Sequence, residues 1–288
     1  MKRRLLRAVL FGFLGAVLWQ HGAVAQTVHY VDNIRTCDGL TPCYSAIMDA
    51  VNAAASFDTI EVFPGVYHEA VVFSGKDHIV LKAHDEALRP VIAAPAGGLD
   101  AVAITASPGV HVLRFILEAP EAAGVAVDGG GSSATVIQGN LVNARSGVTL
   151  GGSVSCTARD NTVLGSGISL PSGNDCLIER NTLDGAGIVI GGSPSGVKRT
   201  TVQQNVVRGG GIGLSGKNVR DNTVGSNFVS ASPGDGISVQ TVNGSTANVI
   251  QDNTSIENAA CDINDSSSGG GNTWANNRFG TRCGAATE

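Results

Sequence analysis

The sequence is poor in aromatic residues and in long apolar runs, and each shortage excludes a class of protein. Aromatic residues make up 5% of the 288 residues, so burial has to come from many small aliphatic contacts rather than from a few large rings. The apolar run from Ala8 to Trp19 is too short to span a bilayer, and no other stretch approaches the roughly 20 apolar residues of a membrane helix. We therefore expect a soluble protein without a membrane partner.

The chain also lacks a surplus of basic residues. Its formal net charge is −5, with 19 Lys and Arg against 24 Asp and Glu. Four of the basic residues precede the apolar run, which ends in Ala23-Val24-Ala25, and this pattern predicts a signal peptide over residues 1–25. Its removal changes the charge from −5 to −9. A protein this acidic is a poor partner for nucleic acid, and we expect it to be secreted or periplasmic.

Histidines are few, and none lies in the second half of the chain. The five that follow the signal peptide lie between His29 and His111, so a Ser-His-Asp site downstream of them is excluded. No CxxC motif or pair of histidines at metal-ligand spacing occurs either. We expect no metal site and no cofactor, although Ca²⁺ would be needed if the protein were a polysaccharide lyase.

Glycine, by contrast, is abundant at 39 residues, and it opens a short apolar tetrad that recurs every 20 to 25 residues. A period in the twenties predicts a solenoid, and the repeats contain only short Val, Ile and Leu runs separated by polar turns, with no helical run. The six clear copies begin at Gly124, Gly147, Gly167, Gly187, Gly211 and Gly236, and a degenerate seventh copy begins at Ala260.

A second marker runs in step with the glycines and supports the same architecture. Asparagine recurs once per repeat, which predicts a ladder of stacked amides at a bend of successive coils. Such a ladder is architectural, because one active site has no use for seven copies. The expected members are Asn140, Asn161, Asn181, Asn205, Asn222, Asn253 and Asn277.

We predict an all-β protein, a right-handed parallel β-helix of one domain. Between Tyr44 and Ala55, apolar residues recur at helical spacing, which predicts a short helix that covers the N-terminal end of the solenoid. The expected divisions are a signal peptide at 1–25, a cap with this helix at 26–58 and the β-helix at 59–288, with a first strand from Thr59 to Phe63. We expect a monomer.

All six cysteines follow the signal peptide, an even number that predicts disulfides in an exported protein. Cys156 and Cys176 each lie five residues before a ladder asparagine, so they should stack on neighbouring coils, either bonded or as two buried thiols. The other expected pairs close a small N-terminal loop and the last coil: Cys37 with Cys43, and Cys261 with Cys283.

The segment from Ala46 to Ala83 carries an alanine-rich helix, then Gly65-Val66-Tyr67-His68-Glu69, and then Lys76. It resembles the N-terminal cap and first coils of right-handed parallel β-helix proteins of the pectin-lyase-like class. The resemblance implies that Tyr67 and Glu69 tie the first coils together. It identifies the fold more specifically than the activity, since many proteins with different activities share this fold.

Elements that carry catalysis in enzymes of that class are missing. Paired carboxylates of a polygalacturonase type, the sequence elements of pectin methylesterases and the Asp-Pro-His element of alginate epimerases do not occur. A charged stripe just before the asparagine register remains, in which opposite charges should stack on neighbouring coils. The stripe either holds neighbouring coils together through these charge pairs or lines a shallow groove for a glycan. Its members are Arg159, Asp160, Glu179, Arg180, Arg220, Asp221 and Asp252.

The sequence therefore favours an exported β-helix protein that binds, and in one reading also processes, a polysaccharide. The alternative is a structural or surface-interaction module without catalysis. A third possibility, a periplasmic accessory protein that presents a metal or cofactor to a partner, has no ligand cluster to support it. The catalytic residues, if there are any, cannot be assigned from the sequence.

Overall fold

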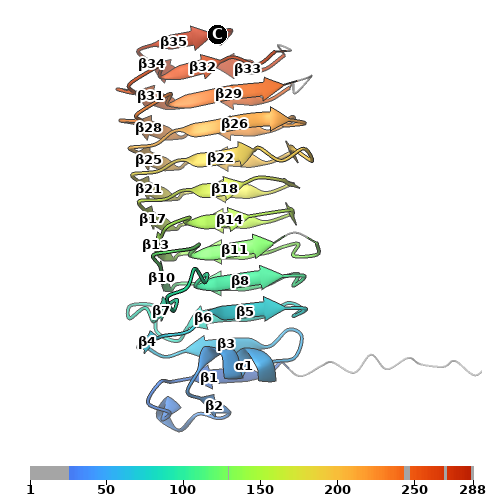
Figure 1. Cartoon of the computed structure of the whole chain (residues 1–288), viewed down its shortest axis with the longest axis vertical. Coiled ribbons are helices and arrows are strands. Elements are labelled where there is room, and N and C mark those ends of the chain that lie inside the picture. The colour runs from blue at the N-terminus through green and yellow to red at the C-terminus, as the bar shows by residue number, and fades with distance from the viewer. Residues whose placement is uncertain (1–25, 129, 243–246, 269–270, 287–288) are drawn as a thin grey trace, which may run out of the picture.

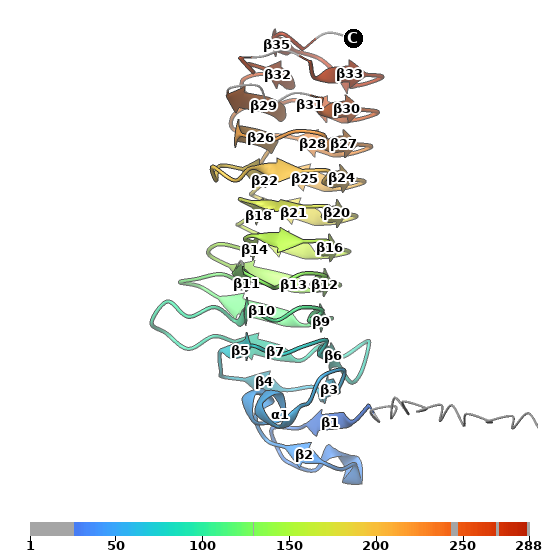
Figure 2. The same cartoon turned by 90° about the vertical axis from the view of Figure 1, so that its right-hand side faces the viewer.

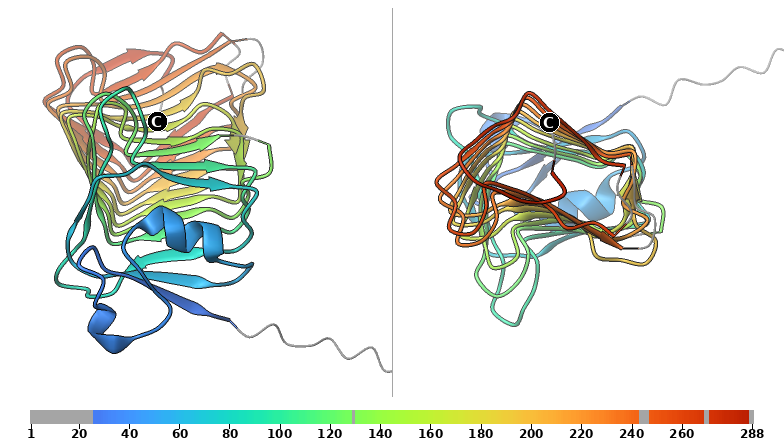
Figure 3. Two further views of the ribbon diagram at one scale, coloured as in Figure 1. Left: turned by 60° about the horizontal axis from the view of Figure 1, so that its bottom comes forward. Right: turned by 90° about the horizontal axis from the view of Figure 1, so that it is seen from above.

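The computed structural model describes residues 26–128, 130–242, 247–268 and 271–286. The predicted signal peptide lies outside the described residues. The chain winds into coils that stack along one axis, with the first coils at one end and the last at the other (Figures 1 and 2). Viewed along this axis, the coils superimpose and their strands form the walls of a prism (Figure 3). The predicted parallel β-helix is thus confirmed.

Every strand pair of the solenoid is parallel, because each strand pairs with its counterpart one coil away. Sheet A has 12 strands, in the order β2 (Cys43–Tyr44), β1 (Val28–Val31), β3 (Thr59–Val62), β6 (Val80–Ala83), β9 (His111–Leu113), β12 (Val136–Gln138), β16 (Thr157–Arg159), β20 (Leu177–Glu179), β24 (Thr201–Gln203), β27 (Thr223–Gly225), β30 (Val249–Gln251) and β33 (Thr273–Ala275).

Two further sheets of 10 strands form the other walls. Sheet B contains β4 (Val66–Tyr67), β7 (Val91–Ala93), β10 (Ile116–Ala119), β13 (Leu141–Ala144), β17 (Thr162–Leu164), β21 (Thr182–Asp184), β25 (Val206–Arg208), β28 (Phe228–Ser230), β31 (Thr254–Ile256) and β34 (Arg278–Phe279). Sheet C contains β5 (Val71–Ser74), β8 (Val102–Thr105), β11 (Val125–Asp128), β14 (Val148–Leu150), β18 (Ile168–Leu170), β22 (Ile188–Gly191), β26 (Ile212–Lys217), β29 (Ile237–Val242), β32 (Ile263–Asp265) and β35 (Arg282–Gly284). A short sheet D joins β15 (Ser153–Val154), β19 (Gly173–Asn174) and β23 (Val197–Lys198).

The core is a set of aliphatic rows that run the length of the solenoid. Because alternate residues of a strand point to opposite faces, the parallel register stacks each inward residue on its equivalent in the next coil. Few aromatic side chains are needed, since each coil adds small aliphatic groups to every row. The inward row of sheet A, all of it buried, consists of Ile60, Leu81, Val112, Ile137, Ala158, Ile178, Val202, Val224, Ile250 and Trp274.

The N-terminal end is covered by α1 (Ile47–Ala53) and by a short 3-10 helix, η1 (Cys37–Gly39), as the helical spacing predicts for α1 (Figures 1 and 3). Strand β1 pairs in parallel with β3, so sheet A already begins inside the segment assigned to the cap. The Tyr67 hydroxyl lies within hydrogen-bond distance of the carbonyl oxygens of Phe63, at 2.9 Å, and Val31, at 3.2 Å, and it thereby ties the first coils together. Among the described residues, no helix is long and apolar enough to cross a membrane.

An asparagine ladder stands at the bend between sheets A and B. In each rung, the backbone N–H and the amide Nδ2 of one asparagine donate to Oδ1 of the next, at 2.9 to 3.2 Å. Six of the seven expected asparagines lie in it, but Asn222 does not, and Asn227 takes its place. The ladder is Asn140, Asn161, Asn181, Asn205, Asn227, Asn253 and Asn277.

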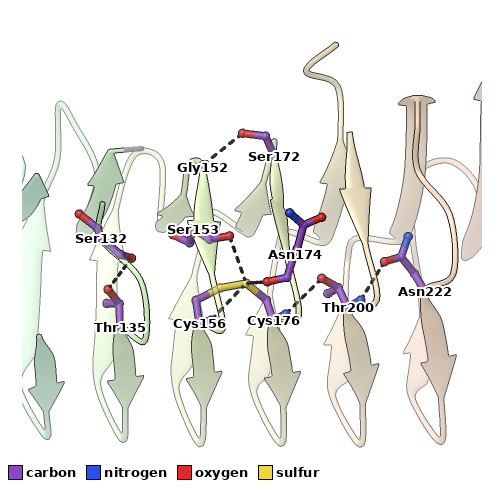
Figure 4. Close-up of a disulfide and its surroundings, with 10 residues drawn as sticks. All are labelled: Ser132, Thr135, Gly152, Ser153, Cys156, Ser172, Asn174, Cys176, Thr200 and Asn222. Atoms are coloured by element: carbon purple, nitrogen blue, oxygen red, sulfur yellow. Dashed lines mark hydrogen bonds between the residues drawn. A yellow bond between two sulfur atoms is a disulfide. The ribbon is translucent and has the colours of Figure 1, made fainter. Parts of the chain in front are cut away.

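Asn222 belongs instead to a second ladder, at the bend that leads into sheet A. Here Thr200 N–H donates to Asn222 Oδ1, and Asn222 donates to Asn248 Oδ1, which is followed by Asn272. The row continues in the other direction through Cys176 and Cys156, which form a disulfide in place of further amide rungs (Figure 4). The disulfides Cys37–Cys43, Cys156–Cys176 and Cys261–Cys283 are the three predicted pairs.

Candidate functional site

The outer face of sheet A carries a row of side chains that are polar except for Leu113. The last outward residue of each strand stacks on its equivalent one coil away, about 4.8 Å along the axis. We call this set the outer row, and it comprises Tyr30, Glu61, Lys82, Leu113, Gln138, Arg159, Glu179 and Gln203. Two of the predicted stripe residues, Arg159 and Glu179, lie in it.

Asp160 and Arg180 stand beside the outer row, at the bend before the asparagine ladder. Both have left-handed backbone conformations, with φ of 56° and 51°. Their side chains stack as predicted, with Arg180 Nε 2.8 Å from Asp160 Oδ1 and Arg180 Nη2 3.2 Å from Asp160 Oδ2. The hydrogen bond to Asp160 raises the pKa of Arg180, so this guanidinium is already occupied by a carboxylate.

The other expected pair does not form. Arg159 and Glu179 are in register on neighbouring strands, as predicted, but Glu179 turns toward its own neighbour. Glu179 Oε1 lies 2.8 Å from Arg180 Nη1, and Oε2 accepts a hydrogen bond from Gln203 at 3.0 Å. Since Glu179 is only 7% exposed, these two contacts leave its carboxylate well satisfied without Arg159.

Arg159 is held by an amide rather than by an acid. Its Nη2 donates to Gln138 Oε1 at 2.9 Å, and its Nε is buried with no hydrogen-bond partner. Within the described part of the chain it makes no ion pair. Arg159 therefore carries a positive charge on the outer row that no carboxylate neutralises.

The structure disperses the remaining stripe residues. Arg220 and Asp221 lie at the bend before β27, where the backbone of Arg220 forms an isolated β-bridge with Lys198. Arg220 Nη1 lies 3.7 Å from Asp221 Oδ2. They do not join the outer row of sheet A. Asp252 follows β30 at the same bend as Asp160, but it lies four strands farther along the sheet.

A cavity of about 230 Å³ opens beside the outer row near the N-terminal end, lined by Lys82, Ala83, His84, Glu86, Leu113, Arg114 and Gln138. Glu61 accepts from Lys82 Nζ and from His84 Nδ1, each at 2.8 Å. Burial acts to raise the pKa of Glu61, but these two partners outweigh it and lower the pKa. Arg114 contacts Glu86. The cations of this cavity thus have carboxylate partners.

His84 is the one aromatic ring among the residues that line this cavity. His84 stacks on Phe63, with ring centroids 4.0 Å apart, and Tyr30 meets His84 edge-on at 6.4 Å. The charged stripe predicted from the sequence contains none of these cavity residues, and no motif marks them. The only available signal was their place as outward residues of strands whose register was not yet known.

A second cavity of about 220 Å³ lies at the N-terminal ends of the first strands of sheet A, lined by Gln26, Phe57, His78, Val80, Gly109 and His111. The His78 ring stacks on Phe57 at 4.7 Å, and its Nδ1 lies 2.5 Å from Asp77 Oδ1. Burial, with the nearby charges of His78 and Arg159, lowers the pKa of His111. His111 is therefore neutral at neutral pH.

Residues 105–285, more than half of the chain, match the family described as "Periplasmic copper-binding protein (NosD)". The chain belongs to the NosD family. This places the protein in the periplasm, and the three disulfides agree with a location outside the cytoplasm. No curated protein matches the chain in sequence.

Solved structures similar to this NosD-family chain are other β-helix proteins. An alginate lyase from Paenibacillus sp. str. FPU-7 is 15% identical, with a TM-score of 0.66 over 89% of this chain and 99% of that one. An exopolygalacturonase from Thermotoga maritima is 11% identical, with a TM-score of 0.55 over 80% of this chain and 70% of that one. At such identities the likeness shows a common fold and nothing more.

The described residues do not fit the copper of the family description. All the described cysteines are in disulfides, and Met48 Sδ accepts a hydrogen bond from the N–H of Val72. The described residues contain no group of three His, Cys, Asp or Glu that could hold a metal ion. The pair His78 and His111 brings two imidazoles to one cavity, short of the three or more protein ligands of a resident site.

Proposed function

We propose that this periplasmic protein binds a polysaccharide lengthwise along the outer row of sheet A. The observation that supports this proposal is a row with one side chain per coil, polar except for Leu113, that runs from Glu61 to Gln203 beside the cavity lined by His84. Such a row offers carboxylate, amide and guanidinium groups at a fixed interval to the repeated hydroxyls of an extended glycan.

The shape of the face favours an extended ligand over a small molecule. The coils repeat about every 4.8 Å, which is comparable with the length of one sugar residue, so successive sugars would meet successive members of the row. Gln138 and Gln203 can each donate and accept hydrogen bonds, and the rings of Tyr30 and His84 can pack against the apolar face of a sugar.

The proposal covers binding and not cleavage. A glycosidase needs two carboxylates placed on either side of the scissile bond, one of them protonated. On this face the carboxylates of Glu61, Glu86, Asp160 and Glu179 are each held in an ion pair with a cation, so we assign none of them a catalytic role. The alternative is that the protein serves as a structural module, in which the same charge pairs only hold neighbouring coils together.

A steric variant separates the two functions. Leu113 points outward and lines the cavity, so Leu113→Trp should fill it and lower the affinity for glycans. The matched control is Val189→Trp, which places the same ring on the outer face of sheet C, at a position that is 47% exposed. Binding of the mature protein is measured on a glycan array and then by calorimetry.

We expect the wild-type protein and Val189→Trp to retain at least one polysaccharide and Leu113→Trp to lose it. Equal binding by all three proteins would move the site away from sheet A. A failure of the wild-type protein to bind any glycan would leave the structural module as the function. Circular dichroism of both variants checks that the β-helix is intact.

A further inference from the structure

The charge of Arg159 distinguishes it from the other cations of this face. Lys82 lies 2.8 Å from Glu61, Arg180 lies 2.8 Å from both Asp160 and Glu179, and Arg114 contacts Glu86. Arg159 has Gln138 alone, an uncharged partner that fixes the guanidinium without neutralising it. Within the described residues of this face, the acids are therefore committed to other cations.

The neighbours of Arg159 also leave its charge uncompensated. Glu179, the acid in register with it, is held by Arg180 and Gln203. His111, on the other outward row of the same sheet, interacts with Arg159 but is kept neutral by burial and by nearby positive charges. Gln138, which holds Arg159, lines the cavity beside the outer row. Arg159 does not itself line the cavity, so a polymer that extends from the cavity along the outer row would meet a fixed, unneutralised guanidinium next to Gln138.

We infer that Arg159 binds a carboxylate of the bound polymer, so that the ligand is a polysaccharide containing uronate residues. This inference rests on the proposed function. A carboxylate matches the planar donors of a guanidinium, and such charge-assisted pairs are among the strong hydrogen bonds of proteins. A neutral polymer laid over the same place would cover the charge and leave it without a partner, which costs free energy and disfavours that ligand.

The test compares acidic oligosaccharides with their neutral forms. Oligogalacturonate and oligomannuronate, and the carboxyl-reduced form of each, are titrated into the mature protein by calorimetry at low and at physiological salt. The variant Arg159→Gln removes the charge and keeps hydrogen-bonding groups. The control Arg199→Gln removes an equal charge at an exposed position paired with Asp175, outside the outer row.

We expect the wild-type protein to bind at least one acidic oligosaccharide about tenfold or more tightly than its reduced form, since a charge-assisted hydrogen bond contributes about 1.5–3 kcal/mol. Arg159→Gln should lose most of this preference and bind the reduced form as the wild type does. Arg199→Gln should keep the preference. Arg159→Lys should restore part of it, since it keeps the charge but not the planar fork.

The outcomes that overturn the inference are distinct from those that overturn the proposed function. Equal affinity of the wild type for acidic and reduced forms would show that the face binds glycans without reading carboxylates. A loss of preference in Arg199→Gln as large as in Arg159→Gln would assign the effect to overall charge. Binding of neither form would contradict the proposed function, and this inference with it.

Discussion

Glu69 and Lys76 hold the two ends of the same helix, although both lie in the coil that follows it. The Glu69 carboxylate accepts hydrogen bonds from the N–H groups of Ile47 and Met48, both at 2.8 Å, at the start of α1. Lys76 Nζ donates to the carbonyls of Asn52 and Ala54 at its end. The residue before α1 is Ala46, which offers no side-chain cap, so these two charges satisfy orphan backbone groups and complement the helix dipole.

Glu69→Ala should therefore destabilise the N-terminal cap. The substitution leaves two backbone N–H groups of α1 without their acceptor, and we expect a loss of about 1–3 kcal/mol in the free energy of unfolding. Glu118→Ala, at an exposed position on the outer face of sheet B, is the matched control and should change little. Urea unfolding followed by circular dichroism measures both. Equal effects of the two variants would contradict the capping role.

The asparagine ladder gives a second prediction on stability. Asn181 is buried and bonded to both neighbouring rungs, so Asn181→Ala should cost about 1–3 kcal/mol by leaving buried polar groups unpaired. Asn277 stands at the C-terminal end of the ladder, so Asn277→Ala should lower the free energy of unfolding by less than Asn181→Ala does. Asn143→Ala, an exposed asparagine on sheet B, is the control and should be nearly neutral. Denaturant unfolding measures these changes. Similar losses of unfolding free energy in Asn143→Ala and Asn181→Ala would argue against a stabilising ladder.

The error over Asn222 shows what the sequence could and could not establish. Arg-Asp-Asn-Thr-Val occurs twice, at 159–163 and at 220–224, but the two copies occupy different positions in the coil. The first copy spans the end of a sheet A strand and the bend after it, whereas the second spans the bend before such a strand. Spacing was the better guide, because Asn222 follows Asn205 by only 17 residues, and Asn227 restores the interval to 22.

The fold was predictable because the glycine and asparagine periods repeat through most of the solenoid. The site was less predictable, since it depends on which of several neighbours within reach each side chain contacts. Register alone placed Arg159 opposite Glu179, but it could not show that Glu179 prefers Arg180 and Gln203. The cavity near His84 arises in early coils that precede the regular repeats, so no period marked its residues.

The buried carboxylate of Asp58 gives a prediction for acid stability. Burial acts to raise its pKa, but hydrogen bonds from the N–H groups of Thr27 and Ala55 and from His29 outweigh this effect, so the pKa is lowered. A lowered pKa contributes stability that is fully present above the unfolded value of about 3.9 and is lost as the pH falls through the folded value. The unfolding midpoint should thus fall with pH in this acidic range.

Asp58→Asn tests this contribution against the other acids. The variant should be less stable than the wild type at pH 7. The difference should shrink as the pH falls below about 4, where the Asp58 carboxyl of the unfolded chain takes up a proton before that of the folded protein does. Asp32, Asp262 and Asp265 also have lowered pKa values, so the variant should keep part of the acid dependence. Urea midpoints from pH 7 to pH 2.5 measure the curves. A constant difference across this range would contradict the contribution of Asp58.

The last prediction concerns copper, which the family description names and the described residues do not fit. The untagged mature protein is dialysed in the presence of a competing chelator, once against Cu(II) and once against Cu(I) with a reducing agent too weak to open its disulfides. In both cases it should retain far less than one copper ion per chain. A polyhistidine-tagged copy is the positive control for the metal measurement. Tight, stoichiometric copper in the untagged protein would contradict the prediction. The double variant His78→Ala/His111→Ala would then show whether that copper sits in the two-histidine cavity, since loss of the metal there would assign it to these imidazoles.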